Sequence, residues 1–123
     1  MLAVNAPELV NRLILMSPAG TLARIAAQWL VRMFSATSMV STGPFRWEFL
    51  PPTKLTDDEL RRISAPATVL LGDREVIYAG GPEAAIARAH RLIPNVHTRL
   101  LQGAGHVPTL DAPDVVVAEM TAR

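Results

Sequence analysis

Two apolar runs, each followed by a glycine turn that carries ionisable residues, constrain the fold of this chain more than any other feature. The first run, 67–71, is followed by Gly-Asp-Arg-Glu at 72–75, and the second, Leu100-Leu101 at the end of a predicted strand over 96–101, is followed by Gln-Gly-Ala-Gly-His at 102–106. Aliphatic and β-branched runs bounded by glycine are typical of strands, and catalytic groups collect on the loops that follow them. If the two strands are parallel neighbours, an acid and an imidazole meet at the carboxyl edge of one sheet.

The other periodic segments indicate an alternation of strands and helices. Leu13–Met16 is a continuous apolar run, as expected for a strand covered on both faces. Thr56 opens a short helix with an S/T-x-x-E capping box. Pro82–Leu92 and Asp114–Met120 are predicted helices, the second begun by Pro113. This order predicts an α/β fold with a parallel sheet of about three strands and right-handed crossovers.

The segment between the first two predicted strands has a different character. From Thr21 an apolar stripe at helical spacing lies beside a basic one, which indicates a core or lid helix; a helix lying on a membrane surface is the less common alternative. An irregular part with Gly43-Pro44 and Pro51-Pro52 follows. We therefore predict a helix followed by irregular structure between these two strands.

The order strand, Gly-Asp-x-acid, helix, strand, Gly-x-Gly-His, and then Asp-Ala-Pro at 111–113 resembles the C-terminal half of an α/β-hydrolase. The resemblance covers about residues 3–120 and is most specific over 66–113. It implies a partial α/β-hydrolase fold, with one C-terminal domain spanning 1–123 and a helical lid or cap segment over about 21–55.

The resemblance also implies roles for individual residues. His106 would be the base of a catalytic triad and Glu75 its orienting acid, with Asp73 as the alternative acid. The residues themselves leave open whether Asp73 caps the turn while Glu75 orients the imidazole, or the reverse. Four aromatic residues of the lid segment would line a mainly apolar pocket for a small ester-like substrate, or would simply pack the lid: Trp29, Phe45, Trp47 and Phe49. That chemistry requires neither an organic cofactor nor a metal.

None of the serines in the 123 residues lies in a G-x-S-x-G motif, the nucleophile elbow of α/β-hydrolases with serine chemistry. The oxyanion-hole loop that follows an early strand in that family is also absent. We therefore predict a chain that is ancestrally a serine hydrolase of ester, amide or C–C bonds and is inactive alone. The alternative is a non-catalytic module, truncated or complementing, that self-associates or pairs with an N-terminal half through the open edge of strand 13–16.

Composition argues against several other classes of function. Twelve basic and eleven acidic residues give a net charge of +1, which provides no cationic face for nucleic acid. No apolar run approaches the ~18 residues that span a bilayer, and no signal peptide is recognisable. The absence of cysteine is compatible with a reducing cytoplasm, where we expect the protein. The spacing of His90 and His97 does not indicate a zinc site, and we expect no metal.

Overall fold

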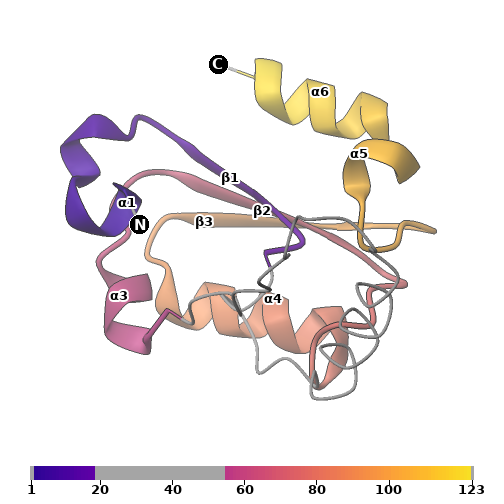
Figure 1. The fold of residues 1–123 in the computed structure, drawn as a ribbon, viewed down its shortest axis with the longest axis horizontal. Coiled ribbons are helices and arrows are strands. Elements are labelled where there is room, and N and C mark those ends of the chain that lie inside the picture. Colours follow the sequence, from indigo (N-terminus) through magenta and orange to yellow (C-terminus); the bar gives the residue numbers. More distant parts are fainter. Residues whose placement is uncertain (1, 19–54, 123) are drawn as a thin grey trace, which may run out of the picture.

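A three-stranded parallel sheet forms the centre of the protein in a computed structural model that describes residues 2–18 and 55–122. The strand order is β1-β2-β3, with bounds Leu13–Met16, Ala67–Gly72 and Val96–Leu101. All three strands lie where the sequence predicted them, and the predicted α/β class is confirmed (Figure 1). The predicted lid lies outside the described residues except for Leu55.

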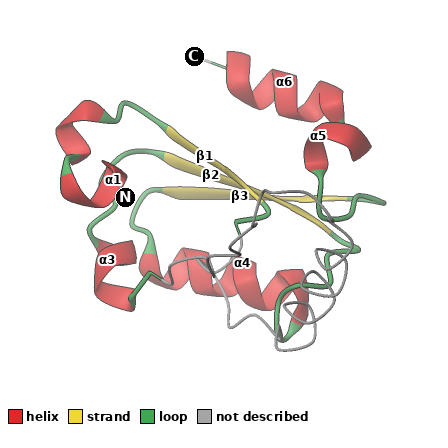
Figure 2. Ribbon diagram, viewed as in Figure 1, coloured by secondary structure: helices red, strands yellow, loops and turns green. Residues whose placement is uncertain are grey.

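Short helices surround the sheet, and α4 makes the crossover from β2 to β3 (Figure 2). In chain order they are α1 (Leu2–Asn5), the 3-10 helix η1 (Pro7–Leu9), α3 (Asp57–Arg61), α4 (Gly81–Leu92), α5 (Pro108–Asp111) and α6 (Pro113–Thr121). The predicted bounds of α4 and α6 are correct to within one residue. Helix α5 was not predicted, because four residues are too few to show helical periodicity. None of the helices in the two described ranges is long and apolar enough to cross a membrane.

Helix α3 begins with the predicted capping box. The backbone N–H of Glu59 donates to the Thr56 hydroxyl at 3.2 Å, and the backbone N–H of Thr56 donates to the Glu59 carboxylate at 2.8 Å. Two N–H groups that have no partner within the helix are thereby satisfied, which gives this five-residue helix a defined start.

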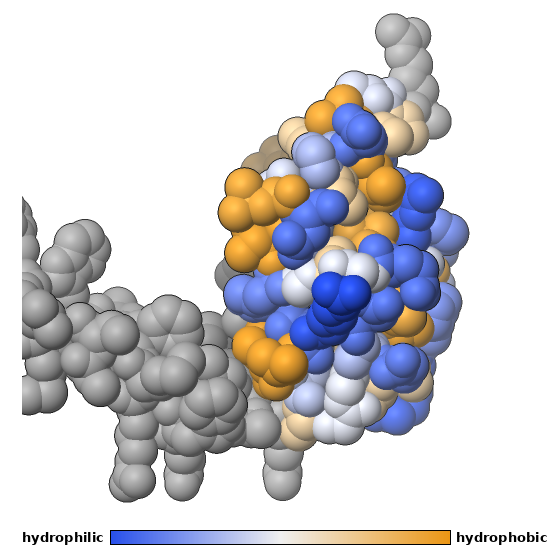
Figure 3. All heavy atoms as spheres, turned by 90° about the vertical axis from the view of Figure 1, so that its right-hand side faces the viewer, coloured by the Kyte–Doolittle hydropathy of each residue, from blue (hydrophilic) through white to orange (hydrophobic). Residues whose placement is uncertain are grey.

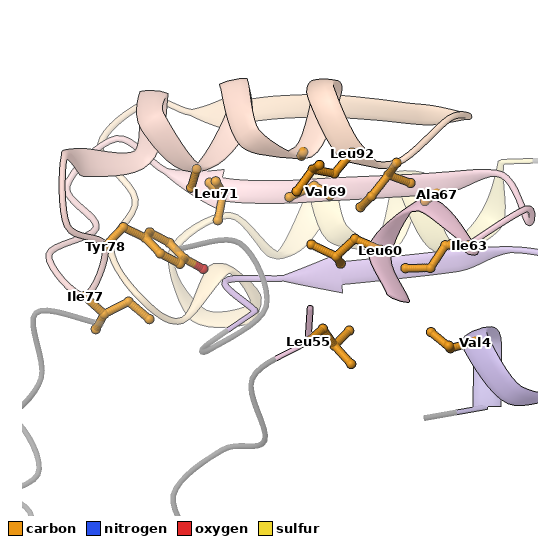
Figure 4. Close-up of a cluster of buried hydrophobic side chains, with 13 residues drawn as sticks. Val4, Leu55, Leu60, Ile63, Ala67, Val69, Leu71, Ile77, Tyr78 and Leu92 are labelled. Carbon is orange, nitrogen blue, oxygen red and sulfur yellow. The ribbon is translucent and has the colours of Figure 1, made fainter. Parts of the chain in front are cut away.

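The two faces of the sheet have separate apolar clusters. On the face covered by α3 and α4, which we call the α4 face, Ala67, Val69 and Leu71 of β2 join a large buried cluster (Figure 4). On the opposite face, covered by α5 and α6 and called the α6 face, Leu70 joins a smaller one. The alternation follows from the two-residue period of a strand, and it places helices on both sides of β2.

Strand β1 is less buried than its apolar sequence indicated. Leu13, Ile14 and Leu15 are half-buried, and Met16 is exposed. Leu13 and Leu15 pack on the cluster of the α4 face and Ile14 on that of the α6 face, so both faces of β1 are covered as predicted, but incompletely. The reason is its position: within the part of the chain that the structure describes, β1 has a strand neighbour on one side only, β2. Its other edge lacks a strand partner there.

Candidate active site

The loops after β2 and β3 leave the sheet side by side. Gly72 and Leu101, the last residues of these two strands, are paired in the parallel register. Beyond them, the backbone N–H of Asp73 donates to Leu101 at 3.0 Å, and that of Arg74 donates to Ala104, also at 3.0 Å. The loop that carries the acids is therefore bonded through its backbone to the loop that carries His106.

Glu75 and His106 form the predicted pair. The Nδ1 atom of His106 lies 2.7 Å from Oε2 of Glu75. The Glu75 side chain is fully buried, whereas the His106 side chain is 49% exposed. Since an ionised carboxylate can only accept a hydrogen bond, the proton between these atoms belongs to Nδ1. In the neutral ring, Nε2 then carries no proton and is an acceptor.

The second oxygen of the Glu75 carboxylate is held by the backbone. Oε1 accepts from the N–H of Val76 at 3.0 Å and from that of Ile77 at 3.2 Å. Burying a carboxylate is costly unless hydrogen bonds replace those it made with water. These two donors and the imidazole provide that replacement, and they fix the direction in which Oε2 points.

Asp73 has a different role from Glu75. Its Oδ1 accepts from the N–H of Gly103 at 2.8 Å, and Gly103 has φ +74, a backbone conformation that favours glycine. Of the two possibilities that the sequence left open, the structure shows Glu75 at the imidazole and Asp73 at the turn before it. The bond of Asp73 joins residues thirty positions apart, so it ties the two loops together and is not a local turn cap.

Two further features of these loops were not predicted. Gly72 lies directly against the loop of His106, and a Cβ atom there would be 2.2 Å from the Ala104 carbonyl oxygen. The backbone N–H of Gly105 donates to Oδ2 of Asp111 at 2.8 Å. The sequence indicated a flexible glycine turn, but contacts between residues far apart decide which atoms hold it.

Tyr78 lies in the same loop as Glu75 and packs in the cluster of the α4 face (Figure 4). Its hydroxyl is buried and has no hydrogen-bond partner among the described residues. Burial, and secondarily the negative charge of Glu75, raises the pKa of Tyr78 well above its ordinary value of 10.0. This phenol therefore holds its proton more tightly than a solvated one.

Other predicted groups lie apart from this pair. Trp29, Phe45, Trp47 and Phe49 lie outside the described residues, so their place in a pocket stays a prediction. His90 Nε2 is 2.9 Å from the Thr98 hydroxyl. Among residues 2–18 and 55–122, no three His, Cys, Asp or Glu side chains are grouped so that they could hold a metal ion.

Comparison with known proteins gives sequence relatives among carboxylesterases. No protein-family model matches the chain. Over 65 residues, the chain is 38% identical to the uncharacterized carboxylesterase nap and 32% identical to carboxylesterase YbfK, both from Bacillus subtilis (strain 168). Each match covers 53% of this chain and 21% of the relative.

Solved structures extend the similarity to almost the whole chain. The carboxylesterase CesB (YbfK) of Bacillus subtilis superimposes with a TM-score of 0.75, and naproxen esterase (carboxylesterase NP) of the same organism with 0.76. Both are 23% identical, and each match covers 97% of this chain and 52% of the other, so the chain spans about half of these enzymes. The chain is therefore related to the α/β-hydrolase carboxylesterases and has part of their fold. The similarity is consistent with the C-terminal portion of an α/β-hydrolase.

Proposed function

We propose that this chain supplies the acid and the base of a serine carboxylesterase, and that the nucleophile lies outside these 123 residues. The observation that carries the proposal is the pair formed by a buried Glu75 and a half-exposed His106 at 2.7 Å. A fixed carboxylate on Nδ1 leaves Nε2 available to accept a proton, which is the arrangement that activates a serine hydroxyl.

The proposed reaction uses the imidazole twice. His106 Nε2 takes the proton of the serine hydroxyl as the serine oxygen bonds to the ester carbonyl carbon, and the carbonyl electron pair moves to its oxygen. Glu75 stabilises the imidazolium through Nδ1. Nε2 then returns the proton to the departing alkoxide, which leaves as an alcohol. As the carbon–oxygen bond to the alcohol breaks, the acyl group stays on the serine oxygen. Nε2 next takes a proton from water as the water oxygen bonds to the acyl carbon, the bond to the serine oxygen breaks, and the proton passes to that oxygen, which releases the carboxylic acid and restores the serine.

The surface around the pair favours a small apolar ester as substrate. Three aliphatic residues on these loops and on α5 are exposed, namely Val76, Val107 and Leu110. Figure 3 views the molecule from the side at which the strands end, and it shows hydrophobic residues interspersed with hydrophilic ones. The descriptions of the sequence relatives as carboxylesterases also favour an ester over the amide and C–C substrates of the same reaction class.

Hydrolysis of short p-nitrophenyl esters tests the proposal. The purified chain is expected to show no turnover above that of buffer, because the chain contains no G-x-S-x-G serine. Turnover by the chain alone that His106→Ala abolishes would show that the nucleophile is already present and would overturn this part of the proposal.

A second candidate function is that of a complementing module without catalysis of its own. The edge of β1 that lacks a strand partner among the described residues favours it, and so does the match to only about half of each solved esterase. We propose that this edge pairs with a strand of an N-terminal half that carries the nucleophile, or with a second copy of the chain.

Mixing the chain with an N-terminal fragment of a related esterase separates these outcomes. Recovered turnover, lowered at least about 10³-fold by His106→Ala, supports a catalytic role for the pair. His90→Ala is the matched control, because His90 is exposed and bonds to Thr98. Association without turnover supports the silent module. Analytical ultracentrifugation of the chain alone tests self-association, which a clean monomer at tens of micromolar would contradict.

A further inference from the structure

One peptide group just before His106 is held at both ends. The peptide between Ala104 and Gly105 accepts through the Ala104 oxygen from the N–H of Arg74 at 3.0 Å, and it donates through the Gly105 N–H to Asp111 Oδ2 at 2.8 Å. The first bond comes from the loop that carries Glu75, and the second comes from α5. The plane of this peptide is therefore set from two sides.

The bond from Asp111 also closes the segment that carries the histidine. Asp111 is the last residue of α5, and its own backbone N–H donates to the Val107 carbonyl at 3.2 Å. Leu110 donates to the same carbonyl at 2.9 Å. With its side chain on Gly105, Asp111 joins both ends of the segment 105–111, and His106 lies inside this closed loop.

Gly105 makes such a restraint necessary. Unlike Gly103, it does not have a positive φ, and a Cβ added to it would lie 3.5 Å from Asp111 Oδ2, an ordinary contact. Neither its conformation nor its surroundings therefore require glycine. A glycine at this place leaves the backbone before His106 free to rotate unless a hydrogen bond prevents it.

We propose that Asp111 is a positioning residue for His106: by holding the Gly105 N–H, its carboxylate keeps the imidazole directed at Glu75. The catalytic use of that imidazole rests on the proposed function, whereas the effect of Asp111 on the position of the ring does not. A charged acceptor makes this hydrogen bond about twice as strong as a neutral one would be. The acid thus acts on His106 through the backbone, without touching the ring.

The test uses the chain itself and needs no turnover. Two-dimensional ¹H–¹⁵N NMR of the histidine side chains reports which ring nitrogen of His106 carries the proton, and how fast the Nδ1 proton exchanges with water. Asp111→Ala is expected to abolish the preference for the Nδ1–H form while circular dichroism stays unchanged. Asp111→Asn retains an acceptor oxygen, so it is expected to keep the preference but to speed exchange several-fold.

The matched controls are Asp114→Ala and Asp114→Asn, which remove the same charge from an exposed residue in the first turn of α6. An Nδ1–H form as populated in Asp111→Ala as in Asp114→Ala would overturn the proposal. If Asp111→Ala does not fold, the comparison of Asp111→Asn with Asp114→Asn decides. The proposal would be overturned if the Nδ1 proton of His106 exchanged with water no faster in Asp111→Asn than in Asp114→Asn. Absence of the Nδ1–H form in the unsubstituted chain would instead count against the proposed function.

Discussion

Leu70 and Leu71 are neighbours on β2 and both are fully buried, yet they lie in clusters of very different size. Among the residues that the structure describes, Leu71 points to the α4 face and joins a cluster of thirteen buried residues, whereas Leu70 points to the α6 face and joins one of four. Helix α6 has a single buried residue, Val116. The fold of these residues therefore depends mainly on the α4 face, while α6 is held by few side chains.

The largest expected effect is a difference between two equal truncations. Leu71→Ala is expected to lower the free energy of unfolding by about 3–5 kcal/mol, because the large cluster cannot close around the cavity. Leu70→Ala is expected to cost about 2–3 kcal/mol, since α6 can move toward the space left behind. Urea unfolding of both variants measures the difference. An equal or greater loss for Leu70→Ala would contradict the comparison.

A second substitution probes the one polar atom in the larger cluster that lacks a partner among the described residues. Tyr78→Phe removes a buried hydroxyl, so we expect it to stabilise the protein by about 1 kcal/mol at neutral pH.

The pKa of Tyr78 adds a dependence on pH. Its folded-state pKa is raised, so the folded protein holds this proton more tightly than the unfolded chain. The associated stability is complete below the ordinary pKa of 10.0 and is lost as the pH rises above it. Thermal unfolding of the unsubstituted chain and of Tyr78→Phe, at pH values below and above 10.0, measures this loss of stability. A decline of equal steepness in Tyr78→Phe would show that Tyr78 is not its source.

A third pair of variants compares the helix ends on the two faces. Thr56→Ala removes the capping box of α3 and is expected to cost about 1 kcal/mol. Arg12 donates to the carbonyl oxygens of Met120, at 2.8 Å, and of Ala122 at the end of α6. Because this contact is exposed, Arg12→Ala is expected to cost only about 0.5 kcal/mol. Urea unfolding gives both values, and a greater loss for Arg12→Ala would reverse the assignment of stability to the α4 face.

The smallest expected effect concerns acid. A hydrogen bond from Arg88 lowers the pKa of Asp57 below 3.8, and the bonds from Thr56 lower the pKa of Glu59 below 4.5. Because these folded-state pKa values are depressed, their contribution is complete above the ordinary values and is lost as the pH falls through the lowered ones. Stability should therefore decline below about pH 4.5, and less so in Asp57→Asn. An identical acid profile in that variant would contradict the effect.

Local pattern predicted much of this fold. The strands, α4, α6 and the cap at Thr56 follow from periodicity and end signals within a few residues of each element. That an acid of the turn 72–75 meets the imidazole of His106 also followed, because parallel neighbouring strands end at one edge of the sheet, whereas the choice of Glu75 over Asp73 came only from the resemblance to α/β-hydrolases. These predictions use either the local sequence or a rule of topology.

The remaining features depend on contacts that no local pattern shows. The bonds of Asp73 to Gly103 and of Asp111 to Gly105 depend on how two loops and a four-residue helix pack. The partial exposure of β1 was not predicted, because an apolar run gives the character of its side chains and not how completely other elements cover them. The aromatic residues of the lid lie outside the described residues and stay predictions.

The contact of Gly72 with the backbone of Ala104 and Gly105 has a consequence for how an enzyme of this kind could be divided. Because the acid and imidazole loops lie in one continuous segment, 72–111, and contact each other there, a cut before β2 leaves both loops in the same piece. When two such pieces reassemble, the hydroxyl of the nucleophile on the other piece has to be aligned with one atom only, Nε2 of His106. Under the proposed function, the acid and the base would therefore reach the nucleophile together, as parts of one piece.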